Sequence, residues 1–411
     1  MSDLKQKIIQ YFSENRASLR EELLHLLAEM VAEKTVNVES EKLPSFPYLT
    51  HRGEEFRVAQ IVERELKKWE IPYQTFARQL ERPNIIARVG SGKVQKKLFI
   101  AAHMDIVPAG DGWDTDPFNM TIIGDHVHGR GVLDNKGPLV SSLLALRAMK
   151  NVVGADNIAG YMEVAALSDE EATDPDGIDY GIGYLLEENL ISPTYAIIPD
   201  IGENMRKIDI AEKGRLVVQV TAIGKQAHGS TPDRGINAIN MMARFLTLLE
   251  NHTLNHRQDP VLGHATVNVG EIRGGAAANI VPGECKVDID IRIVPGQTPD
   301  GVVEEFRLLT EKAHGIFRVE LKDASLPHAI DPNNELVKSI QENSSAYFGF
   351  TPEPYGLGGG TFAKGLNLRG IKAVGFGPGD DTAFHVANEF VSIEQLLDFS
   401  CLLCLVSLDL V

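Results

Sequence analysis

The chain of 411 residues is longer than one hydrophobic core usually supports, and 43 % apolar residues can fill two domains. Its formal net charge of −17 excludes a role in binding nucleic acid or anionic membranes. Three cysteines cannot form a disulfide framework, and neither a secretory signal nor a membrane-spanning stretch is evident. We therefore predict a cytoplasmic protein whose partners are small molecules.

The first half of the chain predicts helices followed by buried strands. Apolar residues recur at helical spacing over 19–30, and a second amphipathic helix is predicted near 54–69. Unbroken apolar runs, typical of strands buried on both faces, then occur at 97–102, 161–167 and 194–198. A helix with a broad apolar face begins after Asp134. Alternating strands and helices indicate an α/β fold with a mainly parallel sheet.

The rhythm changes near residue 208, where strands and helices follow in the order βαββαβ. The predicted elements lie at 213–223, 237–250, 265–272, 284–293, 300–314 and 316–321. That order is typical of a small ferredoxin-like domain. We therefore predict an inserted domain at 208–322 that divides the first domain into 1–207 and 323–411.

Polar residues follow the predicted buried strands at the point where each strand ends. His103 and Asp105 follow the first strand, Glu170 and Glu171 follow the second, and Asp200 follows the third. Because ligands bind at the carboxyl ends of strands in open α/β sheets, these residues should converge. With Asp134, they supply the nitrogen and oxygen ligands that suit zinc, manganese or cobalt. Each motif alone is common on protein surfaces; the combination indicates a metal site.

Several longer motifs carry a family resemblance. They are AAHMDIVPAGDGWDTDPF (101–118), GRGVLDNKGP (129–138), SDEE (168–171), IPD (198–200), GKQAHGSTPDRGINA (224–238), NIVPGE (279–284), DIR (290–292), GGGTFA (358–363) and FHVANE (384–389). Together they resemble the M20 family of metallopeptidases, in particular its PepV and carnosinase-like dipeptidase branch. The resemblance implies that 1–207 and 323–411 form a catalytic domain and that 208–322 forms a lid or dimerisation domain.

The resemblance implies a centre with two divalent cations. Asp134 would bridge them, with His103 and Asp200 completing one site and Glu171 and His385 the other. A carboxylate suits the bridge because its two oxygens and its charge serve two cations. Zinc is the first choice, and manganese and cobalt are the alternatives. Asp105 would accept the ring N–H of His103 and so fix its orientation.

Three catalytic roles follow from the same resemblance. Glu170 would act as general base toward a water that bridges the two cations. His228, in the inserted domain, would stabilise the tetrahedral oxyanion. Asp105 would support the reaction through His103. The reaction implied is hydrolysis of the peptide bond of dipeptides or short peptides.

Substrate-binding residues are implied in the inserted domain and in a glycine-rich loop. Arg292 suits a substrate carboxylate because a guanidinium binds it with two hydrogen bonds. The loop would offer backbone N–H groups and a hydroxyl to the same end of the substrate. The implied set is Asn279, Arg292, Gly358, Gly359, Gly360 and Thr361.

Two features depart from the PepV pattern. Asn135 follows the bridging aspartate, where that pattern commonly has a second aspartate, and the change bears on substrate or metal preference. The inserted domain has the short length of dimeric family members. We therefore predict a homodimer in which His228 acts in the neighbouring subunit.

Three functions remain open from the sequence. GWDTDPF, DNKGP and GGGTFA favour a dipeptidase. An N-acyl amino acid deacylase, such as a succinyl-diaminopimelate desuccinylase or an acetylornithine deacetylase, would use the same two-cation core with a different pocket. A non-catalytic metal-binding protein is the third reading, and the intact Glu170 argues against it.

Overall fold

The computed structural model describes residues 2–172 and 178–411, and these divide into two compact units. The first contains residues up to Ile210, Ile330–Pro354 and Thr361–Val411, and the second contains Ala211–Ala329 and Tyr355–Gly360. Each unit is described by itself. The second unit differs from the predicted insertion by including Tyr355–Gly360, most of the glycine-rich loop.

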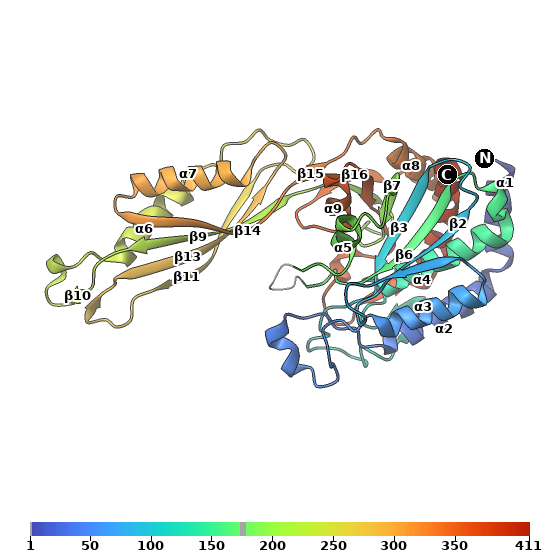
Figure 1. Cartoon of the computed structure of the whole chain (residues 1–411), viewed down its shortest axis with the longest axis horizontal. Coiled ribbons are helices and arrows are strands. Elements are labelled where there is room, and N and C mark those ends of the chain that lie inside the picture. The colour runs from blue at the N-terminus through green and yellow to red at the C-terminus, as the bar shows by residue number, and fades with distance from the viewer. Residues whose placement is uncertain (1, 173–177) are drawn as a thin grey trace. The chain divides into compact units, whose positions relative to one another are not determined.

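The first unit is built on a mixed β-sheet with helices (Figure 1). Strands β6, β3, β7 and β17 run parallel, whereas β1 and β2 add an antiparallel edge beside β6. Its elements are α1 (Asp3–Glu14), α2 (Arg16–Ala32), α3 (Phe56–Lys68), β1 (Tyr73–Phe76), β2 (Asn84–Gly90), β3 (Lys97–His103), β4 (Thr121–Ile123), β5 (His126–His128), α4 (Lys136–Ala148), β6 (Tyr161–Leu167), α5 (Ile182–Glu187), β7 (Tyr195–Ile198), β8 (Lys207–Glu212), α8 (Glu335–Phe348), β16 (Glu353–Leu357), α9 (Phe362–Leu368), β17 (Lys372–Gly375), β18 (Phe390–Ser392) and α10 (Ile393–Leu410).

Burial explains the long apolar runs of this unit. In β3 every residue after Lys97 is buried, because the strand lies inside the sheet and is covered on both faces. Helix α4 is buried at every position except Arg147, and the apolar helix α10 packs against it. Residues of the apolar cluster, including Phe99, Ala165 and Ala196, come from neighbouring parallel strands. The strands are therefore rigidly held, and so are the residues at their ends.

The second unit has the predicted ferredoxin-like order. Its elements are β9 (Gly214–Ile223), β10 (Ala227–His228), α6 (Ala238–Glu250), β11 (Thr266–Gly274), β12 (Ile280–Val281), β13 (Glu284–Ile293), α7 (Pro299–Lys312), β14 (Ile316–Ser325) and β15 (His328–Ala329). The antiparallel sheet has the order β11-β13-β9-β14, and β10 pairs with β12 (Figure 1). Apolar residues of β9 and β13 alternate toward α6 and α7 and form the core of this unit.

Candidate metal centre

Side chains from four separate segments meet at the carboxyl edge of the parallel strands in the first unit. His103 ends β3, Glu171 follows β6, Asp200 follows β7, and Asp134 precedes α4. Two groups place their ligand atoms within 4.8 Å of one another: His103, Asp134 and Glu171 in one, and His103, Glu170 and Asp200 in the other. The geometry thus brings together residues that lie about a hundred positions apart in the chain, as the strand-end pattern predicts.

Asp134 lies between two histidines and directs one oxygen to each. Its Oδ1 is 2.9 Å from His103 Nε2, and its Oδ2 is 3.0 Å from His385 Nε2. His385 Nε2 is also 3.1 Å from Glu171 Oε2, and His103 Nε2 is 3.4 Å from Asp200 Oδ1. Asp134 is thus arranged as a bridge between a His103–Asp200 pair and a His385–Glu171 pair, the pairing that the family resemblance implies.

The electrostatics of this cluster call for positive charge. Burial and the charge of Asp134 raise the pKa of Glu171 to about 8. Burial and the charge of Asp200 raise the pKa of Glu170 well above its usual value. Hydrogen bonds to Asp134 and Glu171 raise the pKa of His385 to about 10. The neighbouring carboxylates therefore disfavour the charged forms of Glu170 and Glu171, and bound cations would compensate that negative charge.

The donor set fits divalent cations. Oε1 of Glu171 is buried and has no hydrogen-bond partner among residues 2–172 and 178–411. A buried carboxylate oxygen without a partner is costly, and a cation would satisfy it. Imidazole nitrogen with carboxylate oxygen is the set that zinc, manganese and cobalt accept. His103, Asp134, Glu171, Asp200 and His385 would hold the two ions.

Asp105 is fully buried beside this cluster and makes further contacts besides the one expected with the His103 ring. The Nδ1 atom of His103 is 3.0 Å from the Asp105 backbone carbonyl oxygen and 3.4 Å from the carboxylate oxygen Oδ1. The carboxylate also accepts the backbone N–H groups of Glu170 and Glu171, both at 3.0 Å, and the Asn37 amide at 2.9 Å. The Asp105 carboxylate thus fixes the backbone of Glu170, the expected base, and of Glu171, an expected ligand, while the Asp105 backbone carbonyl helps to orient His103.

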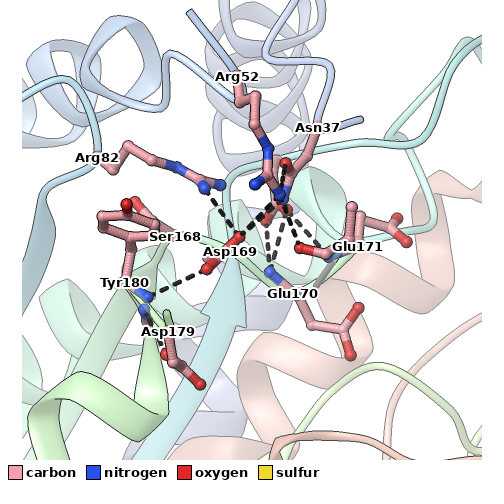
Figure 2. A network of polar contacts seen from close by, with 12 residues as sticks. Asn37, Arg52, Arg82, Ser168, Asp169, Glu170, Glu171, Asp179 and Tyr180 are labelled. Carbon is pink, nitrogen blue, oxygen red and sulfur yellow. Dashed lines mark hydrogen bonds and ion pairs between the residues drawn. The ribbon is translucent and has the colours of Figure 1, made fainter. Parts of the chain in front are cut away.

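A polar network surrounds the loop at 168–171 (Figure 2). Asp169 Oδ1 lies 2.9 Å from Arg82 Nη1 and accepts a hydrogen bond of 3.1 Å from Asn37. Its Oδ2 accepts the Tyr180 N–H at 3.1 Å. Figure 2 shows the Asp169 side chain facing Arg82, whereas the carboxylates of Glu170 and Glu171 point away from that arginine. Asp169 has a φ of 66°, so these contacts hold a backbone conformation that is uncommon outside glycine.

Asn135, the departure from the family pattern, contacts the expected ligand Asp200 directly. Its Nδ2 donates to Asp200 Oδ1 at 2.7 Å and to the Pro199 carbonyl at 3.0 Å. Both partners are acceptors, so an ionised aspartate at this position would repel them. Asn135 therefore orients Asp200 as a donor.

Sequence reasoning did not single out Glu389 and Asp381, which contact the loops that carry Asp134 and Asp200. Glu389 lies in the FHVANE motif, four residues after His385, in a mainly apolar segment (FHVANEFV, 384–391). An acid in such a position was the available signal, because a buried carboxylate needs donors around it.

The implied residues of the second unit form two groups. His228 in β10 pairs with Ile280, and the neighbouring Gly229 N–H donates to the Asn279 carbonyl at 2.7 Å. His228 is exposed, with Nδ1 2.7 Å from Ser230 Oγ. Arg292 instead donates to Asp290 Oδ1 at 2.8 Å and to the Gly358 carbonyl at 3.3 Å.

These two groups lie near opposite ends of the paired strands β9 and β13, the first of them in the separate β10–β12 pair. Glu284, at the start of β13, pairs with Ile223, close in sequence to His228, whereas Arg292 pairs with Arg215 at the other end. Eight residues of extended strand span about 26 Å. Gly358, Gly359 and Gly360 belong to the second unit with Arg292, while Thr361 belongs to the first and caps α9 by accepting the Ala363 N–H at 3.1 Å.

Comparison with known proteins assigns the chain to a family. The M20 peptidase dimerisation domain matches residues 210–316. An acetylornithine deacetylase of Myxococcus xanthus is 32 % identical over 77 % of this chain and 81 % of that protein. An uncharacterised metallohydrolase of Methanocaldococcus jannaschii is 31 % identical over 77 % of this chain and 82 % of that protein. The chain belongs to the M20 family and is a hydrolase of that family.

Similarity in three dimensions supports the same fold. Human carnosine dipeptidase 1 matches with a TM-score of 0.71 over 99 % of each chain at 18 % identity. That resemblance concerns the fold alone, so the dipeptidase branch predicted from the motifs stays a prediction. Within the described residues, no helix has the length and apolar character needed to cross a membrane.

Proposed function

We propose that this protein hydrolyses the amide bond of small substrates that carry a free α-carboxylate, dipeptides above all, with two divalent cations. The observation that carries the proposal is the position of Asp134, whose two oxygens face His103 and His385 at 2.9 and 3.0 Å. A carboxylate between two such ligand groups serves paired cations better than any structural purpose, because burying it there without cations is costly.

When bound, the cations supply Lewis-acid polarisation of the substrate carbonyl and activation of water. Zinc is our first choice, and manganese or cobalt fits the same donors. The residues of the chain supply the remaining steps. His103, Asp134, Glu171, Asp200 and His385 hold the ions, and Asp105 and Asn135 keep the ligands in place.

Glu170 is the proposed general base. Its carboxylate lies in the same group as His103 and Asp200, yet its backbone is fixed separately by Asp105. Glu170 accepts a proton from water as the water oxygen bonds to the carbonyl carbon. It then delivers that proton to the nitrogen when the C–N bond breaks. The raised pKa of Glu170 favours this second transfer.

We propose that the active protein is a homodimer. Arg292 lies near the end of β13, whereas His228 lies in the separate β10–β12 pair, close in sequence to the β9 residue that pairs with the start of β13, so one subunit offers its oxyanion donor and its carboxylate-binding arginine at separate places. In a dimer, each subunit would supply its His228 and Asn279 to the cation site of the other subunit, so that both sites would be complete. The edge strand β11 is largely exposed and carries the apolar Val269 and Ile272, which suits strand pairing between copies. Sedimentation should therefore give a dimer, and a fully active monomer would refute this assembly.

A second candidate is hydrolysis of N-acyl amino acids. The acetylornithine deacetylase relative favours it, whereas GGGTFA and DNKGP in this chain favour dipeptides. Both substrate classes present an amide bond and a carboxylate, so they differ in the pocket rather than in the centre.

A substrate panel tests the proposal. Purified protein dialysed against chelator and then supplied with zinc, manganese or cobalt is assayed on dipeptides, N-acetylornithine and N-succinyl-diaminopimelate. We expect cation-dependent hydrolysis of dipeptides. Hydrolysis of the acyl compounds alone would reassign the substrate class, and no cation-dependent hydrolysis of either class would reject the enzyme.

A further inference from the structure

The segment that carries His385 also carries two acids that are not in the proposed ligand set. Asp381 precedes His385 by four residues, and Glu389 follows it by four. Each carboxylate accepts backbone N–H groups from a loop that carries a different proposed ligand.

Glu389 is fully buried and surrounded by donors from one loop. Its Oε1 accepts the N–H of Leu133 at 2.8 Å and of Asp134 at 3.1 Å. Both oxygens accept the Gly131 N–H, at 3.0 and 3.1 Å. A single side chain therefore fixes the backbone of the loop that ends in the proposed bridging residue.

Arg130 compensates the charge of Glu389 and extends the connection. Its Nη1 lies 2.6 Å from Glu389 Oε2, and both side chains are buried. Its Nη2 donates to the carbonyls of Pro108 and Ala109 at 3.4 and 3.2 Å, on the loop that follows Asp105. The pair thus also joins the His385 segment to the end of the β3 region.

Asp381 makes the corresponding contact on the other side. Its Oδ1 accepts the N–H of Gly202 at 3.2 Å and of Glu203 at 3.0 Å, directly after Asp200. Glu203 has a φ of 46°, so this turn adopts a conformation that needs such support.

We propose that Glu389 and Asp381 are positioning residues of the cation centre: they fix the loops of Asp134 and Asp200 relative to His385 on their own segment. This inference rests on the proposed function. Small displacements of ligands weaken cation binding strongly, since ligand atoms must lie within a few tenths of an ångström of their ideal distances. Both carboxylates accept backbone N–H groups from the loops that carry Asp134 and Asp200, and this links those loops to the segment of His385.

Cobalt binding by the full chain tests this inference without relying on turnover. Calorimetry gives the affinity and number of Co²⁺ ions, and the visible spectrum reports their ligand geometry. The variants are Glu389→Gln, Asp381→Asn and the control Asp409→Asn. Asp409 accepts hydrogen bonds from Asn343 at 2.7 Å and Ser339 at 3.1 Å on helices away from the ligand loops. Thermal unfolding in chelator measures the stability of each variant.

We expect Glu389→Gln to weaken Co²⁺ binding at least about tenfold and to alter the spectrum, while Asp409→Asn leaves both unchanged. Wild-type affinity and spectrum in Glu389→Gln or, if that variant does not fold, in the half-buried Asp381→Asn would overturn the inference. Absence of Co²⁺ binding by the unmodified chain would instead reject the proposed centre.

Discussion

The two units of the molecule hold their proposed functional residues in contrasting ways. In the first unit, the cluster around Asp134 is buried, and carboxylates such as Asp105 fix backbone N–H groups beside it. In the second unit, His228 is exposed and its ring contacts only nearby Ser230 among the described residues. The difference teaches that the first unit preorganises its side chains through buried contacts, whereas the exposed His228 has no such support among the described residues of its own unit, as expected if it acts in the proposed partner subunit.

The largest expected effect is in the buried cluster. Glu170→Gln should lower kcat at least about a hundredfold, because the amide cannot accept the proton of the attacking water. Cation content by metal analysis should not change, since Asp105 holds Glu170 by its backbone. Unchanged turnover in Glu170→Gln would favour a non-catalytic protein.

His228 provides the corresponding experiment in the second unit. His228→Ala should lower kcat about a hundredfold through loss of an oxyanion donor, with stability unchanged because the side chain is exposed. If His228 acts in the partner subunit, unfolding His228→Ala and Glu170→Gln together and refolding the mixture should restore activity. Each heterodimer would then have one site with both an intact His228 and an intact Glu170. Equal mixtures of wild type with each variant calibrate the assay. A mixture as inactive as its components would place His228 in its own subunit's site.

A smaller effect is expected at the residue that departs from the family pattern. Asn135→Asp should weaken cation binding about tenfold, because a second carboxylate would face Asp200 where Asn135 now donates at 2.7 Å. The matched control is Asn279→Asp at an exposed position of the second unit, which should leave cation binding unchanged. Equal cation affinities for Asn135→Asp and the wild type would show that Asn135 does not orient its neighbour.

The smallest effect concerns stability rather than catalysis. Burial raises the pKa of Glu55 to about 7, despite its contact with Arg82. The folded state therefore holds a proton that the unfolded state releases near pH 4.5, so stability from this source is present at low pH and lost as pH rises through about 7.

Denaturant unfolding in chelator measures this contribution. Between pH 5.5 and pH 8.5, the wild type should lose about 2 kcal/mol more than Glu55→Gln. The exposed Glu271 of the second unit is the control, and Glu271→Gln should follow the wild type. Parallel pH profiles for the wild type and Glu55→Gln would contradict the raised pKa.

The sequence predicts the fold and the proposed ligands where a local pattern carries the information. Buried strands followed by acids or histidine predict that His103, Asp134, Glu171 and Asp200 lie together. The βαββαβ order also matches. The predicted last strand ends too early, at residue 321, because a register shift after Leu321 interrupts the alternation, whereas β14 continues to Ser325.

The contacts that fix the ligands are tertiary, and local patterns do not carry them. Glu389 meets the loop of Asp134 across more than 250 positions, and only the folded chain shows that its donors are backbone N–H groups. The same holds for Asp105. Its backbone carbonyl shares the contact with the His103 ring that was expected of the carboxylate, and the carboxylate also accepts the backbone N–H groups of Glu170 and Glu171. Hydrogen-bond geometry within a fraction of an ångström decides such roles.

The central claim is that Asp134 bridges two cations, and the number of bound ions tests it most directly. Calorimetric titration of the dialysed wild-type protein with Zn²⁺ should give two ions per subunit. Asp134→Asn should abolish high-affinity binding of both, because the amide has no negative charge and only one oxygen, whereas Asp134 directs one oxygen toward each histidine. One ion or none in the wild type, or two tightly bound ions in Asp134→Asn, would contradict the claim.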